Sequence, residues 1–118
     1  INHQRKKFMS QHHYITAKGK CVQAGYDRQL RDFFFNFYAK RKNFPLNPAE
    51  TSLDGTVDSR NLDSIKQRVL MLEPTVPEQM WLSIQEDADN NVGNRLVYWN
   101  PDGTIAKEHN PERAHAAG

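Results

Sequence analysis

The sequence has one cysteine, Cys21, so an internal disulfide and a Cys-x-x-Cys motif are both excluded. Long apolar runs are also missing. The longest, residues 33–35 and 69–72, cover about one helical turn each, whereas a membrane-spanning helix needs roughly 20 apolar residues. We therefore expect a soluble chain that does not cross a membrane, and an unpaired cysteine favours a reducing compartment such as the cytoplasm.

Motifs that bind common cofactors are absent as well. The sequence contains no Gly-x-x-x-x-Gly-Lys-Ser/Thr loop, no Gly-x-Gly-x-x-Gly, no Gly-x-Ser-x-Gly elbow and no His-Glu-x-x-His. The three histidines of the first 13 residues and Cys21 match no zinc-ligand spacing. Asp87 lacks the calcium-loop pattern, so its acidic stretch is interpreted as a solvated helix end. We expect no cofactor and no bound metal.

The formal net charge of +2 conceals an uneven distribution along the chain. Residues 1–42 contain ten Lys or Arg against two acids, a balance of +8, whereas residues 43–94 contain three against nine, a balance of −6. Residues 95–118 contain three of each. If these segments stay separate in the fold, the molecule has a strong charge dipole with a basic N-terminal third.

Two short strands are expected near the N-terminus. Residues 12–16 and 21–25 contain β-branched and aromatic side chains and flank a Gly-containing connection, residues 17–20, which is typical of a hairpin. The preceding residues 1–11, with their basic cluster, are interpreted as an arm that leads into the domain.

The clearest periodicity predicts a helix from Asp27 to about Lys42. Apolar residues recur at the i, i+3, i+4, i+7 and i+8 positions, and Asp27 is placed to cap the first turn. Basic residues complement the negative end of the helix dipole, and Phe44-Pro45 ends the element. The face expected to reach the core consists of Leu30, Phe33, Phe34, Phe37 and Tyr38.

Two further helices are expected after a long connection. Residues 43–58 are rich in turn formers, and a connection of this length is unusual in a compact domain. From Ser59, apolar residues at spacings of 3, 4 and 3 predict a helix that Pro74 ends. Thr75 and Glu78 have the spacing of a capping box, which predicts a third helix to about Asp89.

The C-terminal part predicts a β-hairpin, because two apolar segments flank the turn sequence of residues 100–103. A lone hairpin is only marginally stable, so the N-terminal strands are its simplest partner. The expected order is β-β-α-α-α-β-β, an α+β fold with about three helices on a small antiparallel sheet. We assign residues 12–107 to this single domain and residues 108–118 to a flexible tail.

The basic N-terminal third is the leading candidate for a binding site. Its cations are interleaved with aromatic residues, the combination that phosphate contact and base stacking require. On the expected helix, Phe35 falls opposite the apolar face, which would expose its ring. The hypothesis is a non-enzymatic domain that binds nucleic acid through Arg5, Lys6, Lys7, Lys18, Lys20, Arg28, Arg31, Phe35, Lys40, Arg41 and Lys42.

Two alternatives stay open. The same basic surface could bind an acidic protein, or residues 43–94 a basic one, in an interaction or inhibitory module. A small nuclease could instead use His12 or His13 as general acid or base, with Lys18 stabilising the phosphate. In a strand, however, adjacent residues point to opposite faces, so at most one of the two histidines would serve a given site.

Overall fold

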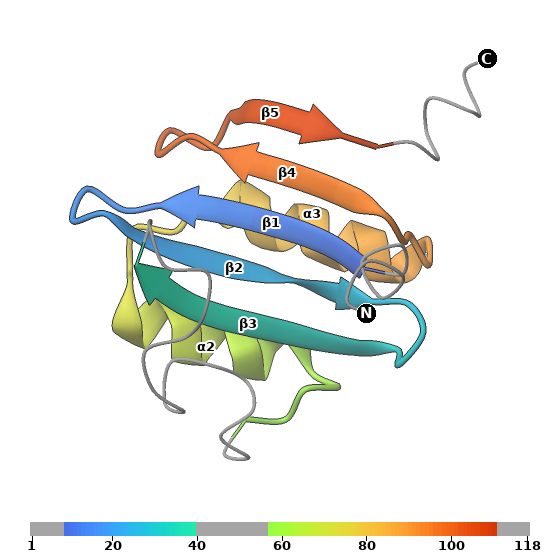
Figure 1. The fold of residues 1–118 in the computed structure, drawn as a ribbon. Helices are drawn as coiled ribbons and strands as arrows, with labels where there is room; N and C mark the ends of the chain where they lie inside the picture. Colours follow the sequence, from blue (N-terminus) through green and yellow to red (C-terminus); the bar gives the residue numbers. More distant parts are fainter. Residues whose placement is uncertain (1–8, 40–56, 111–118) are drawn as a thin grey trace.

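The computed structural model describes residues 9–39 and 57–110, which form a five-stranded sheet with two helices on one face (Figure 1). Among these residues no helix is long and apolar enough to cross a membrane. The elements are β1 (Met9–Ile15), β2 (Lys20–Asp27), β3 (Asp32–Ala39), α2 (Leu62–Leu72), α3 (Glu78–Asp89), β4 (Arg95–Trp99) and β5 (Ile105–His109).

The sheet has the strand order β3-β2-β1-β4-β5, with β1 at its centre. All neighbouring strands are antiparallel except β1 and β4, which are parallel. A parallel pair requires a crossover connection, and the chain makes it through α2 and α3. The α+β class is therefore confirmed, but the sheet is mixed rather than antiparallel.

Both expected hairpins are confirmed. β1 and β2 pair from Met9–Asp27 to Ile15–Cys21, and β4 pairs with β5. Gly19 and Gly103 have φ angles of 82° and 89°, the left-handed conformation that glycine adopts without a steric cost. The strands are longer than expected, since residues 9–11 of the predicted arm belong to β1 and residues 108–109 of the predicted tail belong to β5.

The helix predicted from Asp27 to Lys42 is wrong, because residues 28–31 form a turn and residues 32–39 form β3, which pairs with β2. Asp27 caps the turn instead: its Oδ1 accepts the backbone N–H groups of Gln29 and Leu30 at 3.0 and 3.1 Å. Arg31 closes the turn with a φ of 55°. The observed order is β-β-β-α-α-β-β, and residues 40–56 lie outside the described part.

The two later helices are confirmed, although their first turns differ from the prediction. α2 begins at Leu62 rather than at Ser59, and the side chain of Asn61 caps it by accepting the backbone N–H of Asp63 at 3.0 Å. α3 begins after Pro77 without a side-chain cap. Thr75 does not form the capping box, because its hydroxyl contacts the carboxylate of Glu73.

The core lies between the sheet and the two helices, with α2 on β3 and α3 on β2 and β1. Alternate residues of each strand point toward the helices, as the pleat of a sheet requires. Each large apolar side chain that is fully buried contributes about 1.5–3 kcal/mol. The most deeply buried apolar residues are Val22, Ala24, Phe35, Phe37, Ile65, Val69, Met80, Trp81, Ile84 and Val97.

Candidate functional site

The pleat of β1 separates the two adjacent histidines, as expected of a strand. His12 faces the helices, is 0% exposed and contacts Asp87 of α3. His13 faces the other side of the sheet and stacks on Tyr98 of β4, with ring centroids 4.9 Å apart. Each face of the sheet therefore carries its own cluster of polar side chains, and the two clusters are separate candidate sites.

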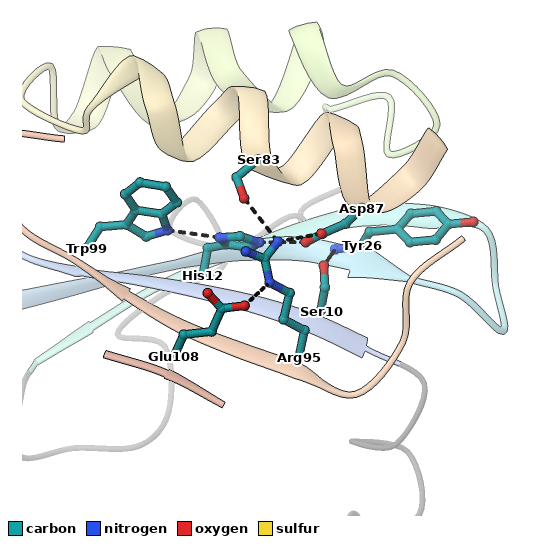
Figure 2. Close-up of polar contacts among 8 residues, drawn as sticks. All are labelled: Ser10, His12, Tyr26, Ser83, Asp87, Arg95, Trp99 and Glu108. Atoms are coloured by element: carbon teal, nitrogen blue, oxygen red, sulfur yellow. Dashed lines mark hydrogen bonds and ion pairs between the residues drawn. The ribbon is translucent and has the colours of Figure 1, made fainter. Parts of the chain in front are cut away.

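The first cluster is a polar network beneath α3, shown in Figure 2. Asp87 lies at its centre: Oδ2 accepts from Nε2 of His12 at 2.7 Å, and Oδ1 accepts from Nη1 of Arg95 at 2.6 Å. Arg95 also donates to Ser83 of α3 at 3.0 Å and to Glu108 of β5 at 2.9 Å. The network thus joins α3 to β1, β4 and β5.

The tautomer of His12 follows from its partners. The indole N–H of Trp99 donates to Nδ1 of His12 at 2.9 Å, and an indole nitrogen can only donate. Nδ1 therefore holds the lone pair, and Nε2 carries the proton that Asp87 accepts. Burial lowers the pKa of His12 by more than the attraction of Asp87 raises it, so the ring is neutral. His12 has no ring nitrogen available for proton transfer to a substrate.

The two charged groups beside His12 hold each other ionised. Burial alone would raise the pKa of Asp87, but the hydrogen bond from His12 and the charge of Arg95 bring it below its ordinary value. Burial likewise opposes the charge on Arg95, whereas Glu108 and Asp87 hold its pKa above the ordinary value. The interpretation of Asp87 as part of a solvated helix end is wrong, since it is 2% exposed.

Acid is expected to weaken the fold through His12. Its folded pKa lies below the ordinary 6.5, so the unfolded chain takes up the proton first, and stability present above pH 6.5 is lost as the pH falls below that value. One such proton changes the unfolding free energy by about 1.4 kcal/mol per pH unit. Urea unfolding from about pH 7.5 to about pH 5 measures this slope.

The matched variant for this pH experiment is His12→Gln, which keeps a donor and an acceptor but does not titrate. Its unfolding free energy should depend much less on pH between about 6.5 and 5. His109→Gln, which removes an exposed histidine instead, is the control for the loss of one imidazole. An equal slope in His12→Gln and the unchanged protein would show that His12 is not the group responsible.

The second cluster lies on the face of the sheet away from α2 and α3. Five cross-strand partners, one from each strand, form a single line that we call the polar row: Asn36, Gln23, His13, Tyr98 and Lys107. Residues directly opposite each other on neighbouring strands share a face, so these side chains are neighbours. The row combines two amides, two stacked rings and an ammonium group.

Hydrogen bonds and ring contacts hold the polar row in order. The amide of Asn36 donates to Gln23 at 3.0 Å, and the amide of Gln23 donates to Gln11 at 2.9 Å. The sulfur of Cys21 lies 3.7 Å from Nδ1 of His13. In the described part of the chain no group of three or more His, Cys, Asp or Glu residues is arranged to hold a metal.

Next to the polar row, the ring of Phe34 on β3 packs over Gly25 on β2. A Cβ at Gly25 would be 3.0 Å from Cζ of Phe34 and would overlap the carbonyl oxygen of Ser10. Only glycine therefore fits at this position, and Phe34 covers it. Phe34 remains partly exposed on this face, so it extends the aromatic surface beside Gly25.

No family model matches this chain, and neither a curated protein nor a solved structure is significantly similar to it. Within the described residues, the predicted basic residues do not form one patch. Lys18 and Lys20 lie at the β1–β2 turn, whereas Arg28 and Arg31 lie at the β2–β3 turn, at the opposite end of the eight-residue strand β2. Outside the described residues lie Arg5, Lys6, Lys7, Lys40, Arg41 and Lys42.

Phe35 is not the exposed ring that the helical interpretation predicts. It is 0% exposed, because the alternation of β3 directs it toward the helices. Sequence reasoning missed Arg95 and Glu108, whose roles depend on Asp87 of α3. The alternation of β4 could have revealed Arg95, because it lies two residues before the buried Val97 and therefore on the same face of the strand.

Proposed function

We propose that this protein binds single-stranded nucleic acid along the polar row, on the face of the sheet away from the helices. The observation that supports the proposal is the partly exposed ring of Tyr98, which stacks on the buried His13 and lies between amide side chains and Lys107. Unpaired bases stack on such rings and form hydrogen bonds with amides, while an ammonium group attracts phosphates.

The shape of this face favours a single strand over a duplex. Neighbouring strands lie about 4.8 Å apart, so the row across five strands is about 19 Å long. Reading a duplex requires an element that enters the major groove, such as a helix or a two-stranded ribbon. α2 and α3 both pack against the sheet, and the row lies on the opposite face. Splayed bases, in contrast, can lie flat on a sheet surface.

Basic residues adjoin two strands of the sheet in the sequence. Lys40, Arg41 and Lys42 follow the last residue of β3 directly, and the basic cluster of residues 5–7 shortly precedes β1. Each neutralised phosphate releases counterions, which makes affinity depend on salt. For about four to six phosphates on a single strand, the logarithm of affinity should fall with the logarithm of salt at a slope of about −3 to −4.

Fluorescence anisotropy of labelled single-stranded and duplex oligonucleotides across about 50–200 mM salt tests the proposal. We expect the single strand to bind more tightly than the duplex. Tyr98→Leu keeps apolar volume but removes the stacking ring, so affinity should fall roughly 5- to 150-fold, the equivalent of about 1–3 kcal/mol per base. The salt dependence of Tyr98→Leu should stay unchanged, because no charge is removed.

Two charge-reversal variants test whether nucleic acid binds at the polar row. Lys107→Glu, in the polar row, should weaken binding and reduce the salt slope by about 1 or more. Arg60→Glu makes the same charge change at an exposed residue before α2, outside the polar row, and should have a much smaller effect. Equal losses in both variants, or no binding at low salt, would contradict the proposed site; the second result would favour an acidic protein partner.

A further inference from the structure

A hollow of about 510 Å³ opens at one end of the sheet, where three connections converge. They are the β1–β2 turn, the α2–α3 connection and the β4–β5 turn, which contributes Pro101. Small-molecule sites have volumes of about 300–1,000 Å³ and often lie on loops that a rigid scaffold positions. The volume of this hollow falls within the range of small-molecule sites, and its walls are loops on a rigid sheet.

The wall of the hollow is largely apolar and open to solvent. Ile15 and Leu72 line it and are 39% and 45% exposed. Pro74 and Pro101 continue the same wall. Large aliphatic side chains gathered around a concavity mark a place where an apolar group gains free energy by displacing water.

The polar groups that line the hollow differ in whether other residues already bind them. The carboxylate of Glu73 accepts the backbone N–H of Thr75 at 3.2 Å and also contacts the Thr75 hydroxyl. The hydroxyl of Tyr14 pairs with Thr75 Oγ1 at 2.9 Å. Lys18 is exposed and forms no ion pair with any residue that the structure describes. Glu73 keeps its negative charge, but its hydrogen bonds hold the carboxylate against Thr75, whereas no described residue holds the ammonium group of Lys18 in an ion pair. Lys18 is therefore the charged group that is freer to pair with a ligand.

We infer that this hollow binds a small monocarboxylate with an apolar body. The carboxylate pairs with Lys18, and the apolar body covers Ile15 and Leu72. A cationic ligand would be repelled by Lys18 and would meet a Glu73 carboxylate that is already oriented toward Thr75. This inference is independent of the nucleic-acid proposal, because none of the lining residues belongs to the polar row.

The test uses three probes of matched shape: 3-phenylpropanoate, the neutral 3-phenylpropanol and the cationic 3-phenylpropylamine. Each is titrated into the full ¹⁵N-labelled chain and followed by amide chemical shifts. We expect 3-phenylpropanoate to bind with a Kd below about 1 mM and at least about 5-fold more tightly than the alcohol. The shifted amides should lie in the three connections around the hollow.

Two lysine variants separate a specific ion pair from general attraction. Lys18→Gln should bring the affinities for 3-phenylpropanoate and 3-phenylpropanol within about 2-fold of each other, while the alcohol still binds. Lys20→Gln removes the same charge two residues away, from a residue that does not line the hollow, and should preserve the preference. Thermal unfolding of both variants confirms that they remain folded.

Several results would overturn the inference. Equal affinity of the carboxylate and the alcohol for the unchanged protein, or tighter binding of the amine, would refute the assignment of ligand charge. Shifts confined to amides outside the three connections would refute the location. Absence of any shift with 3-phenylpropanoate at about 10 mM would refute the site itself, since a Kd below about 1 mM gives near saturation there.

Discussion

Asp87→Ala is expected to lower the unfolding free energy by about 3–5 kcal/mol, a large part of the 5–15 kcal/mol that is usual for a domain. The substitution removes the acceptor that Nε2 of His12 and Nη1 of Arg95 share. His12 is 0% exposed, so water cannot replace that acceptor without opening the core. Removing one partner from a buried pair is costly because the remaining charge stays buried and uncompensated.

Urea unfolding followed by tryptophan fluorescence measures this loss. Asp89→Ala is the matched control, since Asp89 is an exposed carboxylate on the same helix whose side chain accepts a hydrogen bond from Gln85. It should change the unfolding free energy by less than about 0.5 kcal/mol. If Asp87→Ala cost no more than Asp89→Ala, the network would contribute little to stability, and its polar contacts would need another explanation.

The network around Asp87 also accounts for how the C-terminal hairpin is positioned. The helices pack mainly on β1, β2 and β3; β4 reaches the core through Val97 and Trp99, whereas the residues of β5 are exposed or half-buried. Arg95 extends from β4 to Asp87 of α3 and to Glu108 of β5, and each contact requires a particular direction. Directional contacts of this kind select one strand register over its neighbours, which is consistent with the observed parallel pairing of β1 and β4.

Features decided by neighbouring residues could be predicted from the sequence. The turns at Gly19 and Gly103 need a positive φ, and glycine supplies it, so both hairpins were predictable. The spacing of apolar residues and Pro74 predicted α2 and its end. The parallel pairing of β1 with β4 was not predictable, because it depends on contacts such as that of His12 with Trp99, 87 residues apart.

The candidate site was predictable only in part for the same reason. Strand alternation correctly separated His12 from His13, but the commitment of His12 to Trp99 and Asp87 involves residues far along the chain. The polar row likewise requires the register of all five strands. A local reading of charge identified basic residues near the sheet but could not show that Lys107, from the last strand, lies in line with His13.

The error over β3 arose because its aromatic run fits two periods at once. Phe33, Phe34 and Phe37 satisfy the helical spacing of i, i+1 and i+4, while Phe33, Phe35 and Phe37 satisfy the alternation of a strand. Aromatic residues favour strands, and pairing with β2 decides between the two periods. The outcome was therefore set by the tertiary partner rather than by the segment itself.

Phe35→Ala and Leu30→Ala distinguish these two arrangements directly. In a helix Leu30 would be buried and Phe35 exposed, whereas in the structure Leu30 is 55% exposed in the β2–β3 turn and Phe35 is 0% exposed. Phe35→Ala should therefore cost about 3–5 kcal/mol, because it leaves a cavity in the core. Leu30→Ala should cost less than about 0.5 kcal/mol. Urea unfolding of both variants measures the two losses, and the reverse ranking would restore the helical interpretation of this segment.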